Sequence, residues 1–101
     1  MINVIINEQE GVIKVKGHAQ YDDNGHDLVC AGVSALTWAL IMTLENRDML
    51  DHAEEESGDM AIYYESTDKS AEIVDFYMNG INMLTFRYPE NVSVQGRNDN
   101  L

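Results

Sequence analysis

The chain has 101 residues, 45% of them hydrophobic, and its 18 acidic against six basic side chains give a formal charge of −12. The length favours a single domain, and the charge argues against nucleic acid or anionic membrane surfaces as partners, because their phosphates repel an acidic protein. We expect no membrane span, because no apolar run reaches the ~18 residues that a span requires. The chain starts without the basic region and cleavage site of a signal peptide, and its one cysteine cannot form an internal disulfide, so we expect a reduced, cytoplasmic location.

The chain opens with alternating apolar and polar residues, which predict a β-hairpin. Residues 2–7 and 12–16 alternate as strands do, and the polar stretch 8–11 between them supplies the turn. Residues 17–27 carry no period and contain an Asp-Asp-Asn-Gly cluster typical of turns. We interpret this segment as a flexible loop with Gly17 and Gly25 as hinges, and we expect residues 18–26 to be the most mobile internal segment.

The most hydrophobic segment of the protein follows this loop, and its spacing predicts a helix from Leu28 to Glu45. Apolar residues recur there at intervals of three and four, and Asp27 is a good N-cap candidate. Cys30, the only cysteine, then falls in the first helical turn. Because the helix is apolar nearly all round, we expect it to be buried on several sides, and we expect the protein to be a homodimer.

A second hairpin, a second helix and a short strand complete the pattern. Residues 60–64 alternate as a strand, and residues 50–56 are its expected partner across a turn, although their glutamates are poor strand formers. A helix is expected from about Ala71 until the Tyr88-Pro89 pair, with one apolar stripe of Ile73, Phe76, Tyr77, Ile81 and Leu84. Residues 92–94 alternate as a last strand before a frayed tail. The order β-β-α-β-β-α-β predicts an α+β domain over residues 1–101, with two main helices on a mostly antiparallel sheet.

Cys30 and the polar loop before it are the candidates for chemistry. Cysteine attacks as the thiolate, which the free N–H groups and dipole of a first helical turn stabilise. His18 lies twelve residues upstream and could accept the thiol proton if the loop brings it back. Ser34 follows Cys30 by one turn on the same helical face. The other ionisable candidates nearby are Asp22, Asp23, His26 and Asp27.

Spacing alone leaves other roles open for this cysteine. A single cysteine among apolar residues is most often an inert packing residue, and the protein would then be a dimeric binding module. A Cys-His metal site of His18, His26 and Cys30 would lack the paired-cysteine spacing of zinc sites. A redox-sensing thiol would react without needing His18. The sequence contains no glycine-rich phosphate loop, paired-acid site or serine nucleophile motif, and we expect no cofactor.

The residues themselves narrow these alternatives, because residues 17–35 resemble the ribosomal-processing cysteine protease family, Prp. That family carries a Gly-His-Ala, a short loop, and a Gly-x-Asp-Ile-Val-Cys-Ala-x-x-Ser block that opens its first long helix. This chain reads Gly17-His18-Ala19 and then Gly25-His26-Asp27-Leu28-Val29-Cys30-Ala31-Gly32-Val33-Ser34-Ala35, with the same interval from histidine to cysteine. Leu28 in place of the usual isoleucine is the visible departure.

The resemblance implies a small cytoplasmic homodimer that removes the N-terminal extension of a large-subunit ribosomal protein. Relatives in phages are thought to trim capsid or scaffold proteins instead. Cys30 matches the family's nucleophile and His18 its general base, while Asp27 and Ser34 match motif residues with supporting roles. Gly17 matches the glycine that is thought to let the loop move when substrate docks. An acidic surface suits a basic substrate such as a ribosomal or capsid precursor.

Overall fold

A computed structural model describes residues 1–17 and 24–96, and this part of the chain forms seven elements in the predicted order. The helices are α1 (Asn24–Asn46) and α2 (Asp68–Arg87). The strands are β1 (Ile2–Asn7), β2 (Val12–Lys16), β3 (Leu50–Glu56), β4 (Asp59–Tyr64) and β5 (Val92–Gln95). They form one sheet in the order β3-β4-β2-β1-β5, in which only the β1–β5 pair is parallel. The prediction of an α+β fold with a mostly antiparallel sheet is confirmed.

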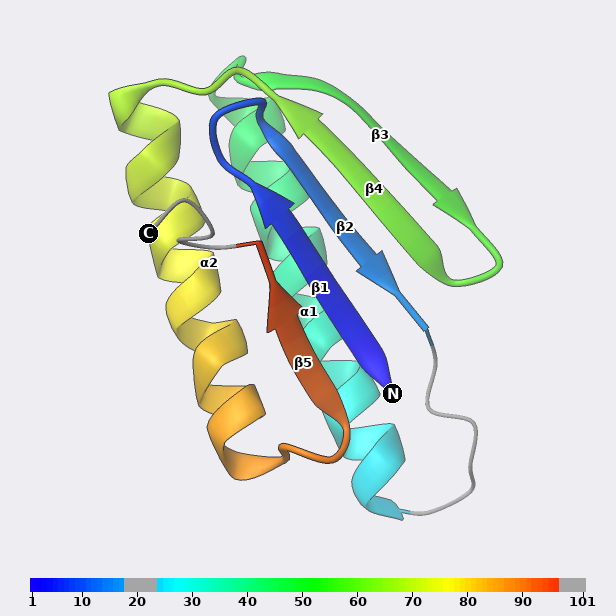
Figure 1. The fold of residues 1–101 in the computed structure, drawn as a ribbon. Helices are drawn as coiled ribbons and strands as arrows, with labels where there is room; N and C mark the ends of the chain where they lie inside the picture. Colours follow the sequence, from blue (N-terminus) through cyan, green and yellow to red (C-terminus); the bar gives the residue numbers. More distant parts are fainter. Residues whose placement is uncertain (18–23, 97–101) are drawn as a thin grey trace.

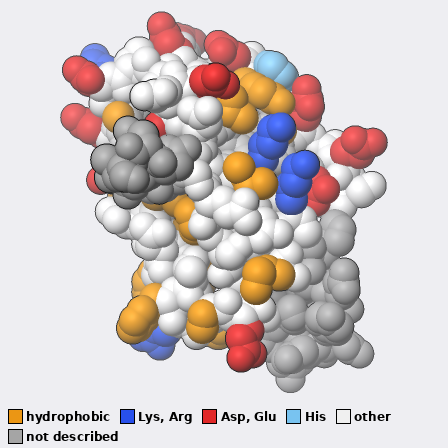
Figure 2. Space-filling view, viewed as in Figure 1, with side chains coloured by type: hydrophobic (Ala, Val, Ile, Leu, Met, Phe, Trp, Pro, Cys, Tyr) orange, Lys and Arg blue, Asp and Glu red, His pale blue; other side chains and the backbone are white. Residues whose placement is uncertain are grey.

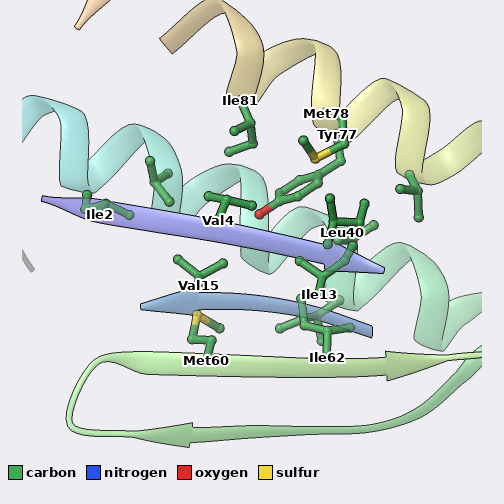
Figure 3. Packing of buried hydrophobic residues seen from close by; sticks show 14 of the residues in the cluster. Ile2, Val4, Ile13, Val15, Leu40, Met60, Ile62, Tyr77, Met78 and Ile81 are labelled. Atoms are coloured by element: carbon green, nitrogen blue, oxygen red, sulfur yellow. The ribbon is translucent and has the colours of Figure 1, made fainter. Parts of the chain in front are cut away.

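Both helices cover the same face of the sheet, and the other face is open (Figure 1). The strand register aligns the apolar residues of neighbouring strands, with Val4 opposite Val15 and Val15 opposite Met60. Because side chains alternate along a strand, all three point to the helical side, where they are buried. Figure 3 shows them beneath Tyr77 and Ile81 of α2, so the hydrophobic core lies between sheet and helices.

The β3–β4 hairpin forms as expected, despite the glutamates of β3. Every residue of β3 after Leu50 is exposed, so the acidic side chains stay in water on this edge strand. The two turn residues, Ser57 and Gly58, both have positive φ, 54° and 89°. That backbone geometry matches the tight two-residue turn that joins twisted antiparallel strands, and it fixes Glu56 opposite Asp59.

Helix α1 begins at Asn24, four residues earlier than predicted, and this corrects three expectations. Asp27 lies within the first helical turn and is not the N-cap, and Gly25 is part of the helix and not a loop hinge. Residues 24–26 are likewise helical, while residues 18–23 of the expected mobile loop lie outside the described part of the chain. The Asp-Asp-Asn cluster that we interpreted as a turn has the composition of a helix N-terminus as well.

Helix α2 begins at Asp68, three residues before the predicted start, because Thr67 and Ser70 form a capping box. The Ser70 amide donates to Thr67 Oγ1 at 3.1 Å, and the Thr67 amide donates to Ser70 Oγ at 2.8 Å. These bonds satisfy backbone donors that a helix start leaves free. The predicted stripe was wrong in one place: Phe76 is 77% exposed, and Val74 is buried instead.

The outward face of α1 keeps apolar side chains exposed within a single chain, since Trp38 is 45% and Met42 58% exposed. Helix α1 is packed against the sheet on one side and against α2 on another, as expected, and only this outward face stays exposed in one copy. Residues Leu28–Asn46 are also long and apolar enough to cross a membrane by length and composition, with a mean hydropathy of 1.7, so the expectation that no segment qualifies was wrong. The core helix of a folded domain passes the same test, and here Val33 and Leu44 of α1 are buried in the core.

Candidate active site

Cys30 is partly exposed and lines a small cavity of about 160 Å³ between α1 and the sheet. The cavity receives residues from four parts of the chain: Ile2 from β1, Gly17 from the end of β2, Ser34 and Thr37 from α1, and Gly58 and Met60 from the β3–β4 turn and β4. Val15 and Met60, which face the helices in Figure 3, give it an apolar wall. The fold thus places Cys30 at a small cavity while leaving it partly exposed.

Cys30 is the seventh residue of α1 and lies in its second turn, so the prediction of a first-turn position was wrong. The four unpaired N–H groups of a helix belong to its first four residues, here 24–27. The dipole effect on a charge falls off beyond the first turn, so the argument from a first-turn position no longer applies to Cys30. The amides of the first turn of α1 lie one turn before the thiol.

Ser34 and Thr37 extend the cavity along α1. Ser34 lies one turn after Cys30, as predicted from spacing, and both residues line the same cavity. Thr37 was not predicted from the sequence. Its hydroxyl donates to the Val33 carbonyl at 2.7 Å and lies 3.0 Å from the Tyr77 hydroxyl, which therefore donates to it. The signal for this contact in the sequence was Thr37 itself, which is a polar residue inside an apolar helix, seven positions after Cys30.

The hydrogen bond from Tyr77 ties α2 to the part of α1 that lines the cavity. Thr37 is completely buried and Tyr77 is 2% exposed, so water cannot replace this bond. Burial raises the pKa of Tyr77 to about 12. The Tyr77 hydroxyl therefore stays protonated at neutral pH and serves as a donor.

Gly17 enters the cavity wall in a conformation that only glycine adopts readily. Its φ is +94°, and a Cβ at this position would lie 2.2 Å from the Met1 carbonyl oxygen. The Gly17 amide donates to Asp59 Oδ1 at 3.0 Å, across 42 residues of sequence. We did not predict a role for Asp59, because an acidic residue after Ser-Gly looks in the sequence like an ordinary residue at the edge of a hairpin turn.

For the remaining candidate residues from the sequence, the structure gives no side-chain contacts. His18, Asp22 and Asp23 lie outside the described residues, and for His26 and Asp27 the structure gives the helical backbone alone. The metal hypothesis for His18, His26 and Cys30 is therefore not tested. Among the residues that are described, no three His, Cys, Asp or Glu side chains gather in a metal-binding cluster.

The third histidine is engaged away from the Cys30 cavity. The His52 ring stacks on Tyr63 with centroids 4.4 Å apart, and its Nε2 lies 3.3 Å from Glu54 Oε2. His52 does not line the cavity of Cys30. It therefore offers no base to the thiol in this arrangement.

The fold is similar to that of proteins whose structures have been solved, among them a protease. Two structures of the ribosomal processing protease Prp from Staphylococcus aureus match, one with a covalently linked product peptide (TM-score 0.75, 20% identity) and one with a substrate peptide (TM-score 0.76, 19% identity). Each match covers 93% of this chain and 95% of the other. A Streptococcus mutans protein matches with a TM-score of 0.74 and 27% identity, over 93% of this chain and 90% of its own.

No curated protein matches the sequence significantly. The family model of the cysteine protease Prp, in contrast, matches residues 1–93. That range includes every element except the end of β5, so the match extends far beyond the motif around Cys30 and confirms the resemblance found there. This chain therefore belongs to the Prp family and is a cysteine protease.

Proposed function

We propose that this protease removes the N-terminal extension of a large-subunit ribosomal protein precursor, with Cys30 as nucleophile and His18 as general base. The observation that carries the catalytic assignment is the cavity that Cys30 shares with Gly17, the residue immediately before His18 in the chain. The peptide complexes of the Staphylococcus aureus protease support a peptide substrate, and its description as a ribosomal processing protease supports the class of precursor.

In the proposed mechanism, His18 takes the proton of Cys30 and the thiolate attacks the scissile carbonyl carbon. The tetrahedral intermediate collapses with cleavage of the C–N bond, and His18 returns the proton to the leaving amine. Water then hydrolyses the thioester and releases the N-terminal fragment as a carboxylate. The free amides at the start of α1 lie one turn before Cys30 and are the natural donors to the oxyanion. Asp27 and Ser34 have supporting roles, and no metal or other cofactor takes part.

A basic substrate fits the charge distribution of the described surface. Figure 2 shows acidic side chains gathered along the upper rim of the open sheet face, where basic side chains also lie on the face itself. A groove of about 580 Å³ between α1 and β3 is lined by Trp38, Glu45, Asp48 and Asp51, with no lysine or arginine among its described walls. Complementary charge of this kind steers a basic chain to the enzyme and favours it over acidic competitors.

We further propose that the protein is a cytoplasmic homodimer. Six large apolar side chains of the helical layer are exposed in one copy, namely Leu28, Trp38, Met42, Phe76, Met83 and Phe86. Monomeric proteins seldom leave a contiguous apolar surface of this kind in water. The unpaired thiol of Cys30 agrees with a reducing compartment.

The test is incubation of the protein with purified ribosomal protein precursors that carry their N-terminal extensions, followed by mapping of the new N-termini. We expect one new N-terminus in one large-subunit precursor, and none with Cys30→Ala. A phage capsid or scaffold precursor forms the second arm. Cleavage of that protein alone would replace the ribosomal substrate with the phage one, and no cleavage of either would contradict the proposed processing role.

A further inference from the structure

We propose that Asp59 is a positioning residue of this protease, which fixes the end of β2 beside Cys30 through the amide of Gly17. The inference rests on the proposed function, because the position of Gly17 matters for catalysis only if the adjoining His18 is the base. Asp59 is the first residue of β4 and lies between Gly58 and Met60, both of which line the Cys30 cavity.

Among the described residues, the strand pairing of β2 ends just before Gly17. The last β1–β2 partner of β2 is Lys16, opposite Asn3, and the last β2–β4 pair is Val15 with Met60. Beyond these pairs the chain leaves the ladder, and the Gly17 amide needs another acceptor. Asp59 Oδ1 accepts from it at 3.0 Å, so a carboxylate continues the β2–β4 contact where backbone pairing ends.

The location of that carboxylate is set by the hairpin turn. The positive φ angles of Ser57 and Gly58 close a two-residue turn, which fixes the register and places Asp59 opposite Glu56 at the start of β4. On the other side of Gly17, the Met1 carbonyl packs so closely that no side chain fits. Gly17 is thus held between the Met1 carbonyl and the Asp59 side chain.

Glycine has the widest backbone freedom of any residue, so without the bond to Asp59 the end of β2 has many more conformations to visit. A base that is displaced by about 1 Å from its productive position can cost on the order of 100-fold in rate. Loss of the Asp59 oxygen therefore lowers the turnover number while substrate binding elsewhere on the enzyme is unchanged. An amide oxygen in the same place accepts the same bond, so the effect depends on the acceptor and not on the charge.

The experiment compares Asp59→Ala and Asp59→Asn with the wild-type enzyme, and uses Glu56→Ala as the matched control. Glu56 is the exposed cross-strand partner of Asp59, and its replacement removes the same charge without touching Gly17. We expect Asp59→Ala to lower kcat for a cleavable peptide by roughly 10- to 100-fold with little change in KM. Asp59→Asn and Glu56→Ala should stay within about threefold of wild type, because both keep an acceptor for the Gly17 amide.

Amide hydrogen exchange at Gly17 gives a second readout that needs no activity. Exchange at this amide should be slowed in the wild-type protein and in Asp59→Asn, and accelerated in Asp59→Ala. Unprotected exchange at Gly17 in the wild type would overturn the inference, even if Asp59→Ala fails to fold. Equal loss of kcat in Asp59→Ala and Asp59→Asn would overturn it in favour of a charge effect. Wild-type turnover by Asp59→Ala, with Cys30→Ala inactive, would refute the role of Asp59 and leave the proposed function intact.

Discussion

The cavity beside Cys30 depends on single residues that lie far apart in the sequence. Thr37 and Tyr77 are separated by 40 residues, and their hydroxyls meet in the buried layer behind the cavity. Gly17 and Asp59 meet on its other side. Sequence spacing predicted that Cys30 and Ser34 share a helical face, but it could not predict these pairs, because each depends on how β4 and α2 dock against the rest of the fold.

The Tyr77 hydroxyl should contribute measurably to stability. Tyr77→Phe removes its hydrogen bond to Thr37, while Thr37 keeps its bond to the Val33 carbonyl. We expect the free energy of unfolding to fall by about 1 kcal/mol, the usual net value of one such bond. Urea denaturation measures the loss. Tyr63→Phe on the open sheet face is the control and should change the stability by less than about 0.5 kcal/mol.

The raised pKa of Tyr77 also predicts how stability changes in alkaline solution. The folded-state pKa of Tyr77, about 12, lies above the usual 10.0. The contribution of its protonated hydroxyl to the free energy of unfolding is therefore complete below pH 10 and is lost as pH rises from 10 toward 12. At pH 11 the wild type should have lost about 1 kcal/mol more than Tyr77→Phe, because unfolding frees the wild-type hydroxyl to ionise. Parallel stability curves for the two proteins between pH 9 and 11 would contradict this assignment.

At the scale of the elements, strands were predictable and helix starts were not. Alternation fixes both the position and the buried face of a strand, and Ile2, Val4 and Ile6 of β1 are all buried as expected. The starts of α1 and α2 lie in polar segments, where turn and cap residues have the same composition. On α2, apolar residues occur on more than one face, so the sequence could not decide between Phe76 and Val74 as the buried one.

Two glycines inside the helices should respond differently to alanine. A Cβ on Gly32 of α1 would lie 3.4 Å from a Leu84 methyl, an ordinary contact, whereas a Cβ on Gly80 of α2 would lie 2.9 Å from Leu36. Alanine favours a helix over glycine by about 1 kcal/mol. We therefore expect Gly32→Ala to stabilise the protein by about 0.5–1 kcal/mol and Gly80→Ala to gain less. Thermal unfolding of both variants measures this, and a larger gain at Gly80 would show the packing argument to be wrong.

At the scale of the whole molecule, the open question is what covers the helical layer. Phe76 is 77% and Phe86 84% exposed, and both belong to α2. If a second copy covers this layer, the wild-type protein should sediment as a dimer at micromolar concentration. Phe76→Asp should shift it toward monomer, because a charge is costly to bury in an apolar interface.

Ala53→Asp on β3 is the control for that experiment, since it introduces the same charge at an exposed site of the sheet. This variant should sediment as the wild type does. A wild-type protein that sediments as a clean monomer would end the dimer proposal, and its exposed apolar side chains would then need a different partner.

The most direct test of the central claim, that Cys30 is the nucleophile and His18 its base, is single-turnover cleavage of a peptide spanning the processing site, from pH 6 to 9. Cys30→Ala should give no cleavage and Cys30→Ser almost none, because a hydroxyl is far less acidic than a thiol. His18→Ala should lose most activity at neutral pH and recover part of it at high pH, where more of the thiol is ionised without a base. His26→Ala should be milder throughout. Cleavage by Cys30→Ala, or a loss in His26→Ala far greater than in His18→Ala, would contradict the claim.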